Sequence, residues 1–177
     1  VHGGHRSQDK ILVARPSEGL DRGAIAMSAQ VNLGDPAEPE MIQRMARITT
    51  DSHKNGIPVL GMFYPRGGNL NLDDSDSTFG VAHAARLAWE LGCNVVKVPW
   101  TGCEESFGIV TSSVPIPVLV SGGPKDDDFG KVLGLVEKSI NAGGSGVCMG
   151  RNVFSSEDPA SRVRALRAVV HDGANSE

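Results

Sequence analysis

The chain has 177 residues, 17 Lys and Arg against 21 Asp and Glu, and a formal net charge of -4. With 40% hydrophobic and 21% charged residues it can bury a core, which argues against intrinsic disorder. The mild acidity argues against nucleic acid or an anionic membrane as a partner, because both need a basic face. No apolar run approaches the roughly 20 residues of a transmembrane helix.

The length and the cysteines indicate how the chain is organised and where it functions. The length suits one domain, and we expect residues 1–177 to form a single one. Cys93, Cys103 and Cys148 are odd in number and form no CxxC pair, which excludes a disulfide scaffold. The first residues contain no apolar signal-peptide core. We therefore expect a cytoplasmic protein.

Apolar runs alternate with helical patterns along the chain. Five strands are predicted, at residues 24–33, 57–64, 94–100, 117–121 and 146–150. Helices are predicted at 36–54, at 79–91, from Glu104, over 129–140 and near 157–170, the last with Ser156 as its cap, Pro159 in its first turn and Gly173 as its stop. Residues 1–23 add a short helix in SEGLDRGA and the remnant of an earlier strand.

These units predict an α/β fold with a parallel sheet. The strands are short and apolar on both faces, and strand–helix units repeat about every 30 residues, as in sheets built from right-handed crossovers. An open doubly wound sheet and a barrel both fit this pattern. A complete (β/α)8 TIM barrel has about 250 residues, so in the second case the chain covers about the last five or six units.

Lys97 is the most informative candidate for chemistry. It lies inside the apolar strand NVVKVPW. Desolvation there would favour the neutral amine, which attacks carbonyl groups to form a Schiff base. The alternative is a structural lysine at a strand end, with its ammonium solvated or ion-paired.

Tyr64 and Arg66 follow the second predicted strand, in FYPRG. In a barrel the carboxyl ends of the strands form the active-site face, where a Tyr hydroxyl can transfer a proton and an Arg can hold an anion. The alternative is a packed aromatic ring beside a solvated Arg.

Two glycine segments follow the fourth and fifth predicted strands. Gly122 and Gly123 come directly after the fourth, and Gly150, Arg151 and Asn152 after the fifth. Glycines at strand ends let backbone N–H groups approach a phosphate, and barrels often hold phosphate in the loops after their last two strands. Either segment alone also fits an ordinary turn, but the pair in this order favours a phosphate site.

Other polar clusters carry weaker signals. His2 and His5 have the HxxH spacing without further ligands, and Asp73, Asp74 and Asp76 lack the spacing of a calcium loop, so no metal site is expected. His53 and His83 are assigned to helix surfaces or packing. Acidic residues 126–128 begin a helix, where negative charge is favourable, and residues 171–173 indicate a helix C-cap.

The blocks GMFYPRG, ELGCNVVKVPWTG, PVLVSGGPK and GVCMGRNVF together resemble a known family. They are similar to the archaeal-type class I (Schiff-base) fructose-bisphosphate aldolases, DeoC/FbaB-like, and equally to the related 2-amino-3,7-dideoxy-D-threo-hept-6-ulosonate synthases. The likeness extends from about Ala24 to His171, and AQVNLGD leans slightly towards the synthases. Some family aldolases have an aromatic residue where this chain has Met62. The family's Asp-His-Gly segment has no counterpart, so the chain is expected to be N-terminally truncated, beginning near the third strand.

The resemblance implies a (β/α)8 barrel and a role for each candidate. Lys97 would be the Schiff-base lysine and Tyr64 the proton donor, with Pro65 and Arg66 lining the substrate site. The phosphate would be held by residues of the last two strand ends: Ser121, Gly122, Gly123, Gly150 and Arg151. The substrate would be a phosphorylated sugar, no metal or organic cofactor would be needed, and a homo-oligomer would be expected.

Four hypotheses follow for the function. The first is an aldolase acting on a phosphorylated ketose or dihydroxyacetone phosphate. The second is the transaldolase-type synthase, which uses aspartate semialdehyde. The third is a non-catalytic remnant that binds sugar phosphates, and the fourth is an unrelated phosphate-binding barrel in which Lys97 is structural.

Overall fold

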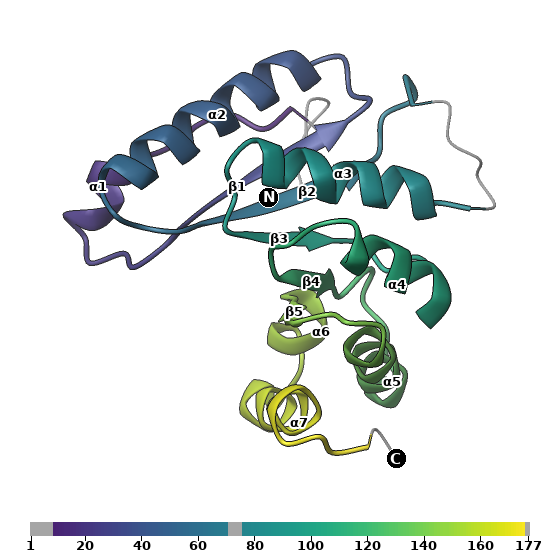
Figure 1. Ribbon diagram of the computed structural model, residues 1–177. Helices are drawn as coiled ribbons and strands as arrows, with labels where there is room; N and C mark the ends of the chain where they lie inside the picture. The colour runs from purple at the N-terminus through teal and green to yellow at the C-terminus, as the bar shows by residue number, and fades with distance from the viewer. Residues whose placement is uncertain (1–8, 71–75, 176–177) are drawn as a thin grey trace.

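A computed structural model describes residues 9–70 and 76–175, which contain one five-stranded sheet. The strands are parallel and lie in chain order: β1 (Met27–Leu33), β2 (Val59–Pro65), β3 (Val95–Val98), β4 (Val118–Ser121) and β5 (Gly146–Cys148). The helices are α1 (Pro16–Leu20), α2 (Glu38–Lys54), α3 (Thr78–Glu90), α4 (Glu104–Ser112), α5 (Phe129–Asn141), α6 (Arg151–Phe154) and α7 (Pro159–His171) (Figure 1). None of the described helices is long and apolar enough to cross a membrane.

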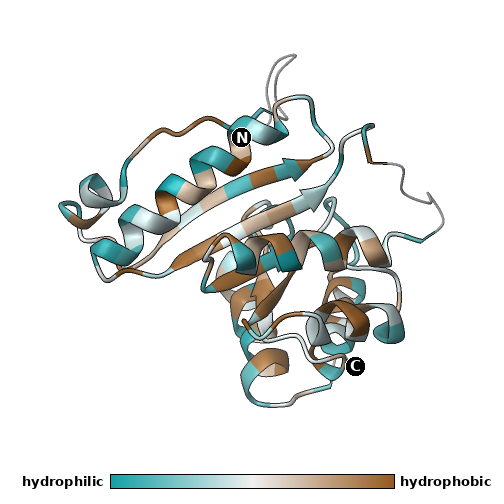
Figure 2. Cartoon of the chain, turned by 45° about the horizontal axis from the view of Figure 1, so that its top comes forward, coloured by the Kyte–Doolittle hydropathy of each residue, from teal (hydrophilic) through white to brown (hydrophobic). Residues whose placement is uncertain are grey.

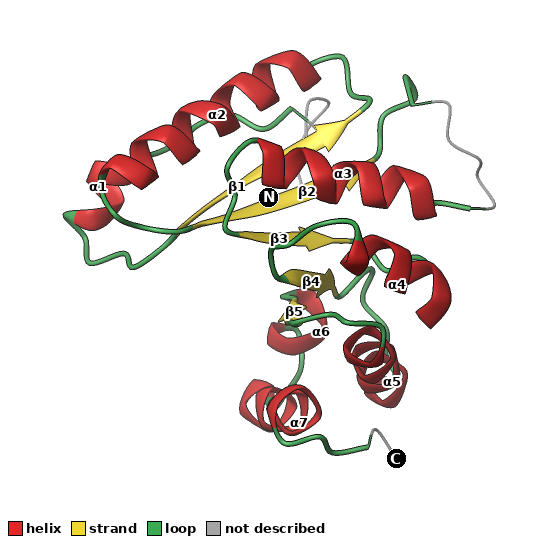
Figure 3. Cartoon of the chain, in the orientation of Figure 1, coloured by secondary structure: helices red, strands yellow, loops and turns green. Residues whose placement is uncertain are grey.

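The strand order distinguishes the two architectures that the sequence leaves open. A doubly wound sheet reverses its order at a switch point, and this places helices on both of its faces. Here the order β1-β2-β3-β4-β5 never reverses, so right-handed crossovers place all the connecting helices on one face. Figure 3 shows α2, α3 and α4 on the same side of the strands. The chain therefore has the architecture of part of a (β/α)8 barrel.

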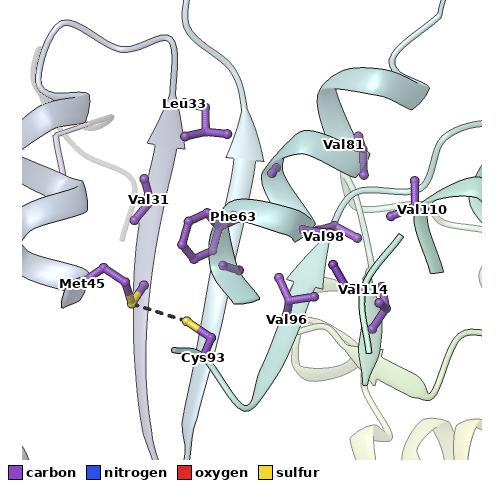
Figure 4. Packing of buried hydrophobic residues seen from close by; sticks show 14 of the residues in the cluster. Val31, Leu33, Met45, Phe63, Val81, Cys93, Val96, Val98, Val110 and Val114 are labelled. Carbon is purple, nitrogen blue, oxygen red and sulfur yellow. Dashed lines mark hydrogen bonds between the residues drawn. The ribbon is translucent and has the colours of Figure 1, made fainter. Parts of the chain in front are cut away.

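The main core lies between the sheet and these helices. Val31, Phe63 and Val96, from three successive strands, are fully buried on the helix side. Figure 4 shows them packed beside Met45 of α2 and Cys93, whose Sγ lies 3.8 Å from the Met45 Sδ. Burial raises the pKa of the Cys93 thiol to about 12.

The opposite face of the sheet is more polar. Successive side chains alternate between the two faces of a strand, so the neighbours of each core residue in the chain point away from the helices. On this face, residues in register on adjacent strands form rows across the sheet, which we call inward rows. In the first row Gln30 is in register with Met62, and Met62 with Lys97; in the next Asn32 is in register with Tyr64. Figure 2 shows this alternation as brown and teal segments along β1.

Two details at the C-terminal side differ from the sequence prediction. The short helix α6 was not predicted, because four residues are too few to show a helical period. The cap of α7 is Asp158 and not Ser156: an Asp158 carboxylate oxygen accepts from the Ser161 N–H at 2.9 Å. The Ser156 hydroxyl instead donates to the Val153 carbonyl at 2.7 Å, which closes the turn after α6.

The N-terminal segment also differs. Its predicted helix is present as α1, but residues 9–15 form no strand. They are held instead by Arg44 of α2, whose guanidinium donates to the Asp9 carboxylate at 3.0 Å and to the Lys10 carbonyl at 2.6 Å. Because this segment makes no ladder, β1 pairs only with β2 among the described strands.

Candidate active site

A cavity of about 460 Å³ opens at the carboxyl ends of the strands, on the polar face of the sheet. Eight of the nine candidate residues line it: Tyr64, Arg66, Lys97, Ser121, Gly122, Gly123, Gly150 and Arg151. Pro65 does not line it, because it follows Tyr64 in β2 and alternation directs the two side chains to opposite faces. The strand-end argument therefore brings together residues that are up to 87 positions apart, from Tyr64 to Arg151.

Lys97 lies in the inward row of β3, between Met62 of β2 and Leu119 of β4. Its side chain is half-buried and faces the cavity. Neighbouring strands are about 4.8 Å apart, so Tyr64, on the next strand and nearer to its carboxyl end, is within reach of a ligand bound to Lys97.

Tyr64 is held from two sides. Only 7% of its surface is exposed, so the ring is packed and its orientation is fixed. The Arg66 guanidinium carbon lies 4.0 Å from the ring centroid, which is a cation–π contact. Arg66 is itself exposed and lines the cavity, so it can bind an anion above the tyrosine.

The two glycine loops face each other across the far side of the cavity. The Arg151 guanidinium donates to the Gly123 carbonyl at 2.8 Å. A Cβ on Gly122 would lie 2.5 Å from the Met149 Cβ, so only glycine allows this approach. Gly123 has φ +62, a conformation that glycine adopts without strain. The two loops thus come close enough to share one ligand.

The charge of the cavity is opposite to that of the chain. Lys10, Arg66, Lys97 and Arg151 line it, and no acidic residue does so in the part of the chain that the structure describes. The whole sequence nevertheless has a net charge of -4. Such a local excess of cations attracts anions, so this arrangement suits a ligand with more than one negative charge.

Sequence reasoning missed several residues of the cavity. Gln30 lines it and donates through Nε2 to the Asn32 Oδ1 at 2.8 Å. A polar pair two positions apart in an otherwise apolar strand was the available signal. Met149 also lines the cavity, but a loop position shows no such period. Asn152, which the sequence places in the segment after the fifth predicted strand, lines the cavity as well.

The weaker candidates that lie among the described residues form no second site. His2, His5, Asp73 and Asp74 lie outside the described residues. His53 and His83 are exposed on α2 and α3, as expected. Across residues 9–70 and 76–175 no group of three His, Cys, Asp or Glu side chains is arranged to hold a metal ion. Asp128 caps α5 by accepting from the Gly130 N–H, and Gly173, with φ +66, follows the C-cap of α7.

Comparison with known proteins identifies the family. The DeoC/LacD aldolase family matches residues 2–156. The chain belongs to this family. It is 37% identical over 163 residues to 2-amino-4,5-dihydroxy-6-oxo-7-(phosphonooxy)heptanoate synthase from Streptomyces griseus, covering 92% of this chain and 59% of that protein. It is 38% identical over 169 residues to 2-amino-3,7-dideoxy-D-threo-hept-6-ulosonate synthase 1 from Archaeoglobus fulgidus, covering 96% and 62%.

The fold has solved counterparts in the same family. A Schiff-base-forming fructose-1,6-bisphosphate aldolase superposes with a TM-score of 0.84 at 33% identity, over 91% of this chain and 64% of that one. The resemblance read from the four sequence blocks is thereby confirmed, for the synthases and for the aldolases. The chain spans about 60% of the length of these relatives.

Proposed function

We propose that this DeoC/LacD aldolase acts through a Schiff base on Lys97, making or breaking a carbon–carbon bond in a phosphorylated ketose. The observation that carries the proposal is a half-buried lysine in the lining of a cavity that has three further cationic and no described acidic lining residues. The solved relative at 33% identity is a Schiff-base-forming aldolase, which supports the same chemistry here.

The reaction assigned to Lys97 is nucleophilic catalysis. Its neutral amine attacks the ketone carbon, and loss of water gives an iminium. The hydroxyl on the departing carbon loses its proton while the iminium accepts the electron pair of the breaking carbon–carbon bond, so an aldehyde leaves and an enamine remains on Lys97. Protonation of the enamine carbon and hydrolysis of the resulting iminium then release the ketone and the free amine. Tyr64 is placed to transfer a proton in this sequence, because it lies on the adjacent strand, faces the same cavity and is fixed by burial.

The anchoring of the phosphate is assigned to the two glycine loops. Ser121 is the last residue of β4 and is followed by Gly122 and Gly123, and Gly150 and Arg151 follow β5. Backbone N–H groups and a guanidinium together suit a phosphate, and holding it there places the ketone carbon beside Lys97. Pro65, which lies on the other face of β2, keeps no role in this site.

Arg66 suits a second anionic group at the other end of the substrate. In the sheet order Lys97 lies between Arg66, which follows β2, and Arg151, which follows β5. A linear substrate with a phosphate at each end fits this order, with its ketone near the lysine. Fructose 1,6-bisphosphate has this form, so its cleavage to dihydroxyacetone phosphate and an aldehyde phosphate is the first reaction to test.

The second candidate is the synthase reaction, because both curated relatives described above are synthases. The name of the Streptomyces griseus product includes a phosphate next to a ketone at one end and an amino acid at the other. An ammonium group would find no carboxylate among the described lining residues, and this favours the bisphosphate. Incubation with dihydroxyacetone phosphate and aspartate semialdehyde, against fructose 1,6-bisphosphate alone, separates the two reactions.

Borohydride trapping tests the shared chemistry. The chain is incubated with dihydroxyacetone phosphate, reduced, digested and analysed by peptide mass spectrometry. An adduct on Lys97 that is lost in Lys97→Met supports the proposal, and Lys138→Met, at an exposed position of α5, is the matched control. A folded chain that gives no adduct with this or any other ketose phosphate would be a binding remnant or a barrel with a structural lysine.

The biological setting remains a prediction in two respects. We expect a homo-oligomer, which light scattering after size-exclusion chromatography tests. We also expect a cytoplasmic location, which fractionation of the source cells tests.

A further inference from the structure

Asn152 occupies the point where the two glycine loops meet. It is the second residue of α6 and only 1% of its surface is exposed. Its Nδ2 donates to the Gly122 carbonyl at 2.6 Å and to the Pro124 carbonyl at 3.0 Å. Its Oδ1 accepts from the Asp126 N–H at 2.9 Å. Both hydrogens of the amide and its oxygen are thus used on one loop.

These bonds determine the shape of the loop between β4 and α5. Asn152 and the neighbouring Arg151 together bind the carbonyls of three consecutive residues, 122 to 124. In a planar trans peptide the N–H points away from the carbonyl that precedes it. With its own carbonyl turned towards Asn152, Gly122 therefore directs the N–H of Gly123 away from α6, and Pro124 has no N–H to compete with it.

Asn152 is in turn fixed from α7. The Arg162 guanidinium donates to the Asn152 carbonyl at 2.6 Å. The same guanidinium carbon lies 4.5 Å from the ring centroid of Phe129, the first residue of α5. One arginine therefore ties α6 to the start of the helix into which the loop leads. The loop is held at its beginning by Asn152 and at its end through Arg162.

We propose that Asn152 is a positioning residue for anion binding: it holds the Gly122–Gly123 loop in the form that binds the substrate's phosphate. This inference rests on the proposed function, because it concerns the phosphate site of that reaction. Asn152 would act through the loop backbone and not on the reacting carbon. Its loss should therefore weaken binding of phosphorylated ligands and leave the amine chemistry of Lys97 intact.

The test compares a ketone that carries phosphate with one that does not. Asn152→Leu keeps a similar side-chain volume and removes every side-chain hydrogen bond. Borohydride trapping on Lys97 is measured against rising dihydroxyacetone phosphate and, separately, rising dihydroxyacetone. We expect the half-saturating concentration of the phosphate ester to rise at least tenfold, and that of dihydroxyacetone to change less than twofold. Equal changes for both ketones, or no change for either, would overturn the inference.

A matched control removes general loss of stability. Ser139 of α5 is fully buried, and its hydroxyl donates to the Val136 carbonyl at 2.8 Å, within its own helix. Ser139→Ala therefore removes a buried hydrogen bond without touching the loop, and it should leave both concentrations unchanged. Asn152→Ala, which leaves room for a water molecule, is the second variant if Asn152→Leu does not fold.

Direct binding of inorganic phosphate distinguishes failure of this inference from failure of the proposed function. Phosphate affinity, measured by isothermal titration calorimetry, does not depend on Lys97 as a nucleophile. We expect the wild-type chain to bind phosphate and the Asn152 variants to bind it at least tenfold more weakly. If the wild type binds phosphate but gives no Lys97 adduct, the proposed function fails and the positioning role stands. Wild-type and variant chains with equal affinity, or a wild type that does not bind phosphate, would overturn the positioning role.

Discussion

Gly67 supports the loop that carries Arg66, and its replacement gives the sharpest stability prediction. A Cβ at Gly67 would lie 1.7 Å from the Gly34 carbonyl carbon and 2.1 Å from the Asp35 nitrogen. Carbon atoms in contact need about 3.5 Å, so the two backbone segments would have to separate by nearly 2 Å. That movement would break the hydrogen bonds from the Gly67 and Arg66 N–H groups to the Leu33 carbonyl, which measure 2.8 Å and 3.1 Å.

The cost of Gly67→Ala follows from these two effects. Overpacking against backbone costs about 1–3 kcal/mol, and two lost hydrogen bonds cost about 1 kcal/mol each. The sum of about 3 kcal/mol or more lowers the Tm of a chain of this size by roughly 6–12 °C. Because the loop moves away from β1, Arg66 also moves from its place above Tyr64, and trapping of dihydroxyacetone phosphate should weaken.

Gly68 supplies the control for this substitution. A Cβ at Gly68 meets no atom within 4 Å. Gly68→Ala should therefore change the free energy of unfolding by less than about 1 kcal/mol, and it restricts the unfolded chain slightly. Thermal unfolding of both variants is followed by circular dichroism. If Gly67→Ala unfolds within about 2 °C of Gly68→Ala, the close contact between the two backbone segments does not exist as described.

Three further predictions concern Cys93, Cys103 and Tyr64. Burial raises the pKa of Cys93 from 9.0 to about 12, so the stability that the neutral thiol contributes is complete below pH 9 and is lost as pH rises towards 12. Between pH 9 and pH 12 the free energy of unfolding, measured in urea, should therefore fall more steeply for wild type than for Cys93→Ala. Parallel curves for the two proteins would contradict this. Contacts with the Ser106 hydroxyl and, to a smaller extent, the Ser106 N–H lower the pKa of the exposed Cys103 thiol. Below pH 9, iodoacetamide should therefore label Cys103 faster in wild type than in Ser106→Ala, as measured by peptide mass spectrometry. Equal labelling rates in the two proteins would contradict this. Tyr64→Phe keeps the aromatic ring beneath Arg66 and removes only the hydroxyl. The Lys97 adduct should still form, while single-turnover cleavage of fructose 1,6-bisphosphate slows by about 10²–10⁴-fold. An unchanged rate of cleavage would exclude Tyr64 as the proton donor.

Much of the fold could be predicted because its signals are local. Each of the five strands is an apolar run bounded by Gly, Pro or polar residues, and the stripe from Phe129 to Ile140 has the period of a helix. The choice between a doubly wound sheet and a barrel could not be read from such runs, because it depends on which strands pair. Short elements also escape this approach: α6 has only four residues, and the Ser156 cap was assigned on residue type alone.

One rule, that parallel strands end at the same edge of a sheet, predicted most of the residues of the candidate site. Parallel strands end at one edge of the sheet, so residues just after the strands, such as Tyr64 and Gly122, had to gather there. The rule does not give the direction of each side chain: Pro65, which the resemblance places in the substrate site, does not line the cavity, because its side chain points to the opposite face of β2 from that of Tyr64. Asn152 could be placed in the segment after the fifth strand, but its contacts could not be predicted, because it makes four hydrogen bonds to residues that are 10 to 30 positions away.

The charge of the cavity connects these observations. Its four cations come from four separate parts of the chain: Lys10 from the N-terminal segment, Arg66 from the loop after β2, Lys97 from β3 and Arg151 from α6. Folding brings the side chains of Arg66, Lys97 and Arg151 to one cavity whose described lining includes no acidic residue, and bringing like charges together costs electrostatic free energy. A bound phosphate would relieve that repulsion, so we expect phosphate to stabilise the folded chain. The hydrogen bonds to the carbonyls of Gly122, Gly123 and Pro124 agree with this interpretation, because they would hold the backbone proposed to bind phosphate in place before the anion arrives and so reduce the cost of ordering it on binding.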